Sequence, residues 1–448
     1  MKFIPTFLAL SAAVAHLAQA DLIAPALTPV VPTPISFSNY TLEWKSLSTI
    51  VENAAIYRVF HAKNKGSSHG KLSVPHPVYQ TLKDLADEAV AKPLYTIVNK
   101  PFLPPSGDKR DWLSYAPYWW PSPSCNATDK NNDCAFIQMD GQVNPDVYKL
   151  NDQRYLEYVS LDTETLAMAS LVFDDDSYGQ KATDMLRYFF LNNATRMNPN
   201  LEYGQIIRGN GKSATHIGRA EGIISARALV SPIRAVKILQ LAKARAWKKN
   251  DTAGMVDWYS QFHDWLIEDK IAVDESNTKN NHLTYYTNTL TTISDFIGNY
   301  STIESRVTAF FKDDLPGQIT ANGTQPLEEI RTLPFHYSAF NLEALTYMAN
   351  FVSQKDPLSH GPYISNAWNQ TGDSIISAVN RLIDVVRGTE GQIEPGADLS
   401  EADYSVRAVG IQYPKLYCNK YHAIQNHTVP YLNLWPLWTP RLLWDCFN

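Results

Sequence analysis

Residues 280–297 read NNHLTYYTNTLTTISDFI, and this stretch indicates the class of fold. Its apolar side chains recur at steps of three and four residues, the spacing that places them on one face of an α-helix. Strand-like alternation is rare along the chain, so we expect an all-α fold. The helical spacing occurs in five sets: Leu166, Ala169 and Phe173; Ala182, Met185 and Phe189; Met255, Trp258, Phe262 and Trp265; Tyr286, Leu290, Ile293 and Ile297; and Ile375, Val379, Leu382 and Val386.

The order of these segments predicts how the helices are arranged. Helical stretches of about ten to twenty residues alternate with connections that contain Pro and Gly, and no repeat of fixed sequence is present. We expect an α/α toroid, an incomplete barrel of paired helices with long loops over its cleft; an irregular helical bundle is the alternative. The segments 100–150 and 388–440 have little helical period and are predicted to be such loops.

The composition bounds the size of the core and the kind of partner. Of 448 residues, 44% are hydrophobic and 19% are charged, so the chain can bury a large core and is neither disordered nor a coiled coil. We expect one large domain or two tightly joined ones. The formal net charge of -6 argues against a nucleic-acid partner, because such proteins usually carry excess positive charge. An acidic substrate remains compatible with a locally basic cleft.

The N-terminus has the features of a secretory signal. Lys2 precedes an apolar run that ends in the small-x-small site Ala18-Gln19-Ala20. We expect residues 1–20 to be a signal peptide, residues 21–41 to be an extended leader rich in Pro and Thr, and residues 42–448 to be the folded domain. No later run is apolar enough to cross a bilayer, which predicts a secreted, extracellular protein with no membrane partner.

The cysteines and sequons agree with a secretory route. Of the three pairings that four cysteines allow, Cys125 with Cys134 and Cys418 with Cys446 close the shortest loops, so we expect two local disulfides. Asn-x-Ser/Thr sequons are more numerous than chance suggests and fit N-glycosylation in a eukaryotic cell. They begin at Asn39, Asn126, Asn193, Asn250, Asn299, Asn322, Asn369 and Asn426.

An aromatic run marks one candidate binding surface. Residues 111–121, DWLSYAPYWWP, place five rings within nine positions. Exposed rings provide a large apolar area for the C–H faces of sugars at little entropy cost. The alternative is that the rings close one end of the domain as part of its core. We take Tyr115, Tyr118, Trp119 and Trp120 as candidate substrate-binding residues.

Two amide-containing segments are second-rank candidates. Asn144 lies in DGQVNP, residues 140–145, and both Asn200 and Gln205 lie in NPNLEYGQ, residues 198–205. Loop amides can bind hydroxyl and carboxylate groups of a sugar. An Asn next to Pro is at least as often a turn former that only shapes the backbone.

Asn281 and His282 stand at the start of the helix predicted above. His282 is four residues before Tyr286 and therefore lies on the same inward stripe. The free N–H groups and the dipole of a helix N-terminus attract an anion. A lone His on such a stripe is more often structural, but the adjacent Asn pair and a second polar cluster favour a functional site.

That second cluster contains an arginine and a tyrosine. Arg331 stands six residues before Tyr337, across an irregular turn that leads to a helix predicted to begin near Phe340. Arginine is the residue best able to hold a carboxylate through a bidentate fork. The alternatives are an ion pair of Arg331 with Glu328 or Glu329, and a hydrogen-bonded core position for the phenol.

The motifs discussed so far occur in a fixed order: WLSYAPYWWP at 112–121, DGQVNP at 140–145, NNH at 280–282 and RTLPFHYSAFNL at 331–342. Together they resemble the alginate-lyase-type superfamily of polysaccharide lyases, in a secreted, fungal-type form. The resemblance implies an α/α toroid and a catalytic set of Asn281, His282, Arg331 and Tyr337. The Leu-Pro-Phe that follows Arg-Thr, and the Cys-bearing C-terminal tail, depart from the family pattern and bear on substrate choice.

The resemblance implies cleavage of a 1,4-linked polyuronate, of the glucuronan or alginate type, by β-elimination. Asn281 and Arg331, together with His282, would neutralise the uronate carboxylate and stabilise the enediolate-like intermediate. His282 or Tyr337 would remove the C5 proton, and Tyr337 would protonate the departing O4. The scheme needs no metal and no other cofactor. We expect a monomer whose partner is an acidic polysaccharide.

Two other classes of function remain open on the residues alone. A glycoside hydrolase on the same toroid could use a pair of carboxylates such as Asp140 and Glu202. A sugar-binding protein without catalysis could keep the aromatic run and lack the chemistry. Elimination creates a conjugated double bond that absorbs ultraviolet light, which distinguishes it from both.

Overall fold

The described part of the chain lies in one compact unit, Phe37–Asn448. The signal predicted at residues 1–20, most of the leader predicted at 21–41, and Cys446 lie outside the described residues. The computed structural model describes residues 40–65, 77–123, 125, 134–209, 214–365, 367–369, 374–391, 393–422 and 434–444.

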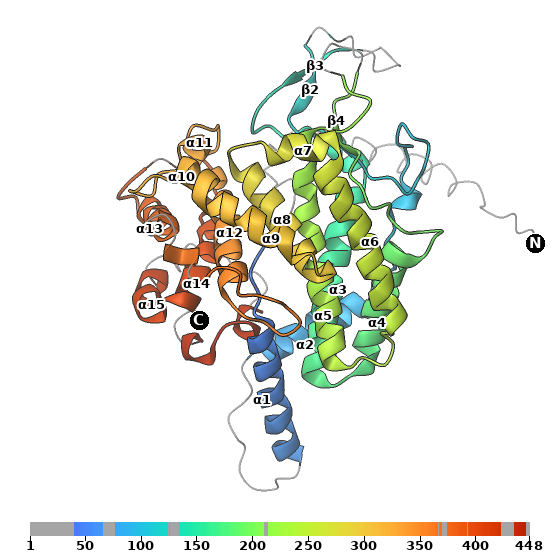
Figure 1. The fold of residues 1–448 in the computed structure, drawn as a ribbon, viewed down its shortest axis with the longest axis vertical. Coiled ribbons are helices and arrows are strands. Elements are labelled where there is room, and N and C mark those ends of the chain that lie inside the picture. The colour runs from blue at the N-terminus through green and yellow to red at the C-terminus, as the bar shows by residue number, and fades with distance from the viewer. Residues whose placement is uncertain are drawn as a thin grey trace, which may run out of the picture. The chain divides into compact units, whose positions relative to one another are not determined.

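Helices dominate the described residues, in agreement with the predicted all-α class (Figure 1). The α-helices are α1 (Leu47–Lys65), α2 (Val78–Ala91), α3 (Asp152–Phe173), α4 (Asp176–Leu186), α5 (Val230–Ala242), α6 (Lys249–Glu268), α7 (Lys270–Ser276), α8 (Asn281–Ile297), α9 (Tyr300–Ala309), α10 (Leu315–Gln318), α11 (Pro326–Glu329), α12 (Pro334–Ser353), α13 (Ser374–Val386), α14 (Ala402–Gln412) and α15 (Pro414–His422). Short 3-10 or π turns are η1 (Ile97–Asn99), η2 (Pro145–Lys149), η3 (Arg187–Leu191), η4 (Ala220–Leu229), η5 (Phe310–Asp314), η6 (Ala367–Asn369), η7 (Leu399–Glu401), η9 (Trp435–Leu437) and η10 (Arg441–Leu443).

The helices pack in neighbouring pairs around one hydrophobic core. Helix α3 packs against α4 and α5, α6 against α8, α8 against α12, and α12 against α13 and α14. The five apolar stripes predicted from the sequence all join this core, with Phe173, Trp265 and Ile297 only partly buried at its margin. The periodicity therefore located these helices and their buried faces correctly.

Helix α8 is central, and it is buried on nearly all sides although it is rich in Thr and Asn. Several of its polar groups are hydrogen-bonded inside the protein: Thr291 Oγ1 donates to the carbonyl of Thr287 at 2.7 Å, and Asn288 Nδ2 donates to the carbonyl of Ala344 on α12 at 2.7 Å. Buried polar groups are tolerated when they are hydrogen-bonded in this way. The hydrogen bond to α12 fixes the two helices that carry the candidate site against each other.

The segment 100–150 is more structured than predicted. It contains β1 (Leu113–Tyr115), β2 (Trp119–Pro121) and β3 (Phe136–Gln138). Strand β1 pairs in parallel with β4 (Tyr203–Ile206), and β2 pairs antiparallel with β3. Three- or four-residue strands are too short to show a clear alternation. In Figure 1 the strands lie at the end of the helices where α7 is also found.

The disulfide predicted within this segment is confirmed. Cys125 and Cys134 are bonded, with 5.5 Å between their Cα atoms, and they join the two sides of the β2–β3 hairpin. Cys418 is also disulfide-bonded. Its predicted partner, Cys446, falls outside the described residues, so the second pairing remains a prediction.

Two predictions from the sequence are wrong, one about a long loop and one about the start of a helix. The segment 388–440 is not one long loop, because it contains α14 and α15. Helix α14 buries the charged residues Asp403 and Arg407 beside its apolar ones, which hid its periodicity. Helix α12 begins at Pro334 rather than near Phe340, since Pro is well suited to the first position of a helix.

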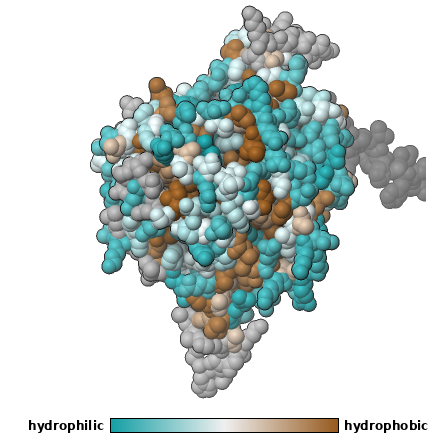
Figure 2. Space-filling model, viewed as in Figure 1, coloured by the Kyte–Doolittle hydropathy of each residue, from teal (hydrophilic) through white to brown (hydrophobic). Residues whose placement is uncertain are grey.

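The surface drawn in Figure 2 is largely hydrophilic and is interrupted by scattered hydrophobic residues. Among the helices that the structure describes, none combines the length and the hydrophobicity needed to cross a membrane.

Candidate active site

Asn281 begins α8 and is held by a carboxylate from another helix. Asn280 caps the helix, because its Oδ1 accepts the backbone N–H of His282 at 3.3 Å. Asn281 is only 1% exposed, and its backbone N–H and its Nδ2 donate to the two carboxylate oxygens of Glu328, each at 2.7 Å. The sequence predicted an anion at this helix N-terminus. In the structure that anion is Glu328, on α11.

His282 forms a close pair with Glu275, at the end of α7. Its Nδ1 lies 2.6 Å from Glu275 Oε1, and its side chain is 18% exposed while that of Glu275 is 1% exposed. Burial lowers the pKa of His282, but the carboxylates of Glu275, Glu221 and Glu328 outweigh it, so that the pKa lies above its ordinary value. Burial also raises the pKa of Glu275, which His282 opposes. The pKa values of His282 and Glu275 are thus both raised, so the pair retains a proton.

Arg331 and Tyr337 are stacked at the start of α12. The guanidinium carbon of Arg331 lies 3.9 Å from the centre of the Tyr337 ring. Arg331 does not form an ion pair with Glu328 or Glu329, the two neighbours considered from the sequence. Its Nη2 and Nε instead contact the carboxylate of Asp140 at 2.9 and 3.3 Å. No local sequence signal points to this partner, which stands 191 residues earlier.

The Tyr337 hydroxyl donates to the hydroxyl of Tyr118 at 3.1 Å. Tyr337 is 6% exposed, and burial together with Tyr118 holds its pKa well above the ordinary value, against the opposing effect of Arg331. Burial raises the pKa of Tyr118 as well. Without substrate, Tyr337 is therefore a protonated phenol, the state required of an acid.

Glu328 joins the two halves of the candidate site. It accepts two hydrogen bonds from Asn281, and its backbone carbonyl accepts the N–H of Arg331 at 3.0 Å. Its charge also acts on both His282 and Arg331. The structure thus brings the four predicted catalytic residues into one connected group, although α8 and α12 are far apart in the sequence.

The aromatic run contains both a core residue and partly exposed rings, so each of the two hypotheses from the sequence, core and binding surface, fits part of it. Trp112 is fully buried and belongs to the core. Tyr115, Tyr118, Trp119 and Trp120 are less completely covered. Cations lie over two of these rings: the Arg208 guanidinium is 4.4 Å from the Tyr115 ring centre, and that of Arg219 is 5.6 Å from Trp119.

The second-rank amides are used within the protein. Asn144 caps η2 by accepting the N–H of Asp146 at 3.0 Å, and its Nδ2 donates to the carbonyl of Trp119 at 2.8 Å. Asn200 accepts the N–H of Glu202 at 3.2 Å. These contacts fit the turn-forming alternative.

Gln205 also uses its amide inside the protein, since its Nε2 donates to the carbonyl of Glu221 at 3.0 Å. It has a φ of 55°, a conformation that is strained for a residue other than glycine and that occurs often near functional sites. A role of the three amides in substrate binding stays a prediction.

Sequence reasoning missed the carboxylates that surround the predicted residues. Glu275 was not singled out, and the spacing of seven residues to His282 crosses the break between α7 and α8. From the sequence, Glu328 is a candidate only as an ion-pair partner of Arg331, and Asp140 only as one of two hydrolase carboxylates. Burial raises the pKa of Asp140, but Arg331 and Thr332 outweigh it and hold the pKa below its ordinary value, so Asp140 is ionised. No group of His, Cys, Asp and Glu suited to a metal ion occurs among the residues that the structure describes.

The phenol, guanidinium, imidazole and amide that the sequence resemblance predicts for a polysaccharide lyase thus lie in one group. Residues 96–392 match the family model described as Alginate lyase, which covers well over half of the chain. The chain therefore belongs to the alginate lyase family. No curated protein shows a significant match to it.

One solved structure resembles the chain over nearly its whole length. An alginate lyase from Bacteroides ovatus is 28% identical, covers 90% of this chain and 99% of its own, and superposes with a TM-score of 0.72. This likeness confirms the α/α toroid expected from the sequence. Alginate lyase A1-III from Sphingomonas species A1 is more distant, with 14% identity over 83% of this chain and 90% of its own and a TM-score of 0.44.

Proposed function

We propose that the protein is a secreted lyase that cleaves a 1,4-linked polyuronate by β-elimination, with Asn281, His282, Arg331 and Tyr337 as its catalytic residues. The observation that carries the proposal is the position of Tyr337, a phenol kept protonated by burial and packed under the Arg331 guanidinium. Such a group can deliver a proton to a glycosidic oxygen while the cation holds the neighbouring carboxylate.

The substrate carboxylate must be neutralised before the C5 proton can leave. Asp140 occupies the Nε and Nη2 side of Arg331, so Nη1 is the side of the guanidinium that a uronate carboxylate would meet. One N–H of the Asn281 amide points to Glu328, and the other is the donor available for a ligand. These donors stabilise the additional negative charge that develops on the carboxylate oxygens as the C5 proton departs.

The elimination then moves one proton from carbon and one to oxygen. The base takes the proton from C5, the electron pair forms the C4–C5 double bond, the C4–O4 bond breaks, and Tyr337 gives its proton to O4. In guluronate H5 and O4 lie on opposite faces of the ring, so His282, oriented by Glu275, is the base. In mannuronate and glucuronate they lie on the same face, so Tyr337 must first lose its proton.

The need to deprotonate Tyr337 on same-face substrates predicts which substrate is cleaved best. Burial and Tyr118 oppose deprotonation of Tyr337, so the substrate-free site suits the two-residue route through His282 and Tyr337. We therefore place alginate that contains guluronate first, and mannuronate-rich alginate and glucuronan second. The matching family description and the Bacteroides ovatus enzyme, both named for alginate, support alginate as the polymer.

The test is a screen of purified protein against guluronate-rich alginate, mannuronate-rich alginate, glucuronan and pectate. New ultraviolet absorbance that rises together with reducing ends supports elimination. Reducing ends without absorbance would mean hydrolysis, and binding without either product would mean a sugar-binding protein; each result would overturn the proposal.

Secretion and glycosylation form part of the proposal and have their own test. Among the sequons in the described residues, Asn193, Asn250, Asn322 and Asn369 are exposed and are expected to carry glycan. Expression in a eukaryotic host should deliver the protein to the medium without residues 1–20. The intact mass before and after enzymatic deglycosylation would check both expectations.

A further inference from the structure

The first turn of α12, which carries Tyr337, has no cap of its own. Leu333 stands at the N-cap position without a side-chain hydrogen bond, and Pro334 has no N–H. The next two N–H groups, those of Phe335 and His336, each donate to one carboxylate oxygen of Glu394 at 2.9 Å. A residue 58 positions after His336 therefore supplies the cap that the local sequence lacks.

A second carboxylate from the same segment holds the ring next to Tyr337. The Nδ1 of His336 lies 2.9 and 3.0 Å from the two oxygens of Glu401. The His336 ring contacts Tyr337 edge to face, with 5.0 Å between ring centres, and stacks on Phe340. Glu401 thus fixes an imidazole against which the phenol packs.

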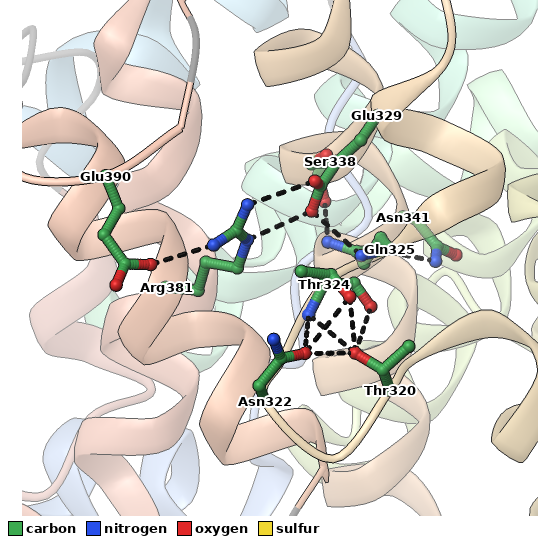
Figure 3. A network of polar contacts seen from close by, with 9 residues as sticks. All are labelled: Thr320, Asn322, Thr324, Gln325, Glu329, Ser338, Asn341, Arg381 and Glu390. Atoms are coloured by element: carbon green, nitrogen blue, oxygen red, sulfur yellow. Dashed lines mark hydrogen bonds and ion pairs between the residues drawn. The ribbon is translucent and has the colours of Figure 1, made fainter.

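The packing beneath this turn is incomplete. A cavity of about 240 Å³ lies between the turn and α13, and Pro334, Phe335 and Ser338 form one of its sides. Figure 3 shows this region, where Arg381 of α13 reaches across to Glu329 of α11. The buried Ser338 hydroxyl has no hydrogen-bond partner among the described residues. Phe335 still packs into the hydrophobic core, whereas the side of the turn that faces α13 lacks close contacts, so the hydrogen bonds from Glu394 act on the turn in addition to core packing.

We propose that Glu394 and Glu401 are positioning residues for Tyr337: the segment 393–401 holds the catalytic turn in place together with the core packing of Phe335. This segment begins directly after residue 392, where the match to the family model ends. The inference rests on the proposed function, because it assumes that Tyr337 acts on the substrate. It assigns to the C-terminal part of the chain a share in the geometry of the reaction.

The test uses the isosteric variants Glu394→Gln and Glu401→Gln. A glutamine at position 394 keeps one acceptor and replaces the other with an amide that cannot accept an N–H. We expect kcat on the best substrate to fall by about ten- to a hundredfold, the scale of a misplaced catalytic group, with little change in KM. A rise in KM with kcat unchanged would overturn the positioning role.

A double-mutant cycle with Tyr337→Phe separates positioning from general damage. If Glu394 acts through the Tyr337 hydroxyl, Glu394→Gln should reduce the residual turnover of the Tyr337→Phe protein little or not at all. An equal proportional loss in both backgrounds would overturn the proposal. Should Glu394→Gln fail to fold, the same cycle with Glu401→Gln decides.

The matched control is Asp175→Ala, which removes the cap of α4, where Asp175 Oδ1 accepts the N–H of Ser177 at 2.8 Å. It should lower Tm by a similar amount and leave kcat unchanged. The two proposals fail in different ways. Full turnover in Tyr337→Phe would contradict the proposed function itself. Loss of turnover in Tyr337→Phe, with normal turnover in both glutamate variants, would contradict only the positioning role.

Discussion

The helices α8 and α12 each present candidate catalytic residues at an N-terminus, but they secure those ends differently. Helix α8 is capped by Asn280, its immediate neighbour in the sequence, and its first residue is held by Glu328. Helix α12 has no local cap and depends on Glu394. The comparison shows that the N-cap of α8 is encoded by the adjacent residue, whereas that of α12 comes from a residue 58 positions after His336.

The two ends also differ in electrostatics. At α8 an imidazole is surrounded by the carboxylates of Glu275, Glu221 and Glu328, which favour its protonation. At α12 a neutral phenol lies against the Arg331 guanidinium. One half therefore holds an imidazole whose protonated form is favoured by carboxylates, while the other holds a neutral phenol that keeps its proton.

The largest effect is expected at the α12 end. Tyr337→Phe removes one oxygen and little packing, so folding should survive, while turnover falls by about two to four orders of magnitude, the usual scale for an acid–base group. Initial rates by ultraviolet absorbance, with melting curves as the control, would measure it. Near-normal turnover on the best substrate would end the assignment of Tyr337.

At the α8 end we expect a smaller loss accompanied by a pH shift. Glu275→Gln removes the charge that raises the pKa of His282 while burial, which lowers it, remains. As a base His282 must be neutral, so the acid limb of kcat/KM on guluronate-rich alginate should move to lower pH, and the maximum should fall by roughly two orders of magnitude. A shift of the alkaline limb instead would mean that His282 acts as a cation on the carboxylate.

The contact between the two helices should make stability depend on pH. Glu343 of α12 accepts the hydroxyl of Tyr285 on α8 at 3.0 Å, and burial raises its pKa to about 7. The pKa of Glu343 is higher in the folded protein than in the unfolded chain. The protonated carboxyl therefore contributes stability that is fully present below about pH 4.5 and is lost as pH rises through 7. The loss is at most about 3 kcal/mol.

Glu343→Gln tests this linkage, since an amide keeps an acceptor and cannot ionise. The variant should match the wild type near pH 4.5 and melt at a higher temperature than it at pH 8. Melting curves across that range would check it, and parallel curves for the two proteins would contradict it.

Removal of the local cap should have a modest effect confined to stability. Asn280→Ala should cost about 1 kcal/mol of unfolding free energy, the usual value for a lost N-cap. Because Glu328 still holds Asn281, kcat should change much less than in Glu394→Gln. Denaturant unfolding and kinetics on the same preparation would compare the two helix ends directly. A large loss of kcat in Asn280→Ala would contradict the difference between the two caps.

The smallest effect is expected from chelation. The proposed route neutralises the carboxylate with protein groups, so prolonged treatment with a chelator should leave turnover unchanged. A loss that added calcium restores, with the melting temperature unchanged, would show that a metal takes part in the reaction.

Local signals explain what could be predicted from the sequence. The step of three and four residues located α8 and its buried face, and the Asn pair marked where it begins. The resemblance to known lyases supplied Arg331 and Tyr337. The partners of these residues could not be predicted, because Asp140 and Glu394 come from distant segments. Helix α14 was missed because Asp403 and Arg407 are buried together on it as an ion pair, which breaks the apolar stripe.

The buried threonines and asparagines of α8 bear on how the protein is made. A helix this polar stays hydrated in the nascent chain, and its Asn288 finds the carbonyl of Ala344 only after α12 has left the ribosome. At about 5–20 residues per second, α12 follows α8 by several seconds, and Glu394 follows several seconds later still. The turn that bears Tyr337 is thus completed near the end of translation, when Glu394 becomes available to cap it.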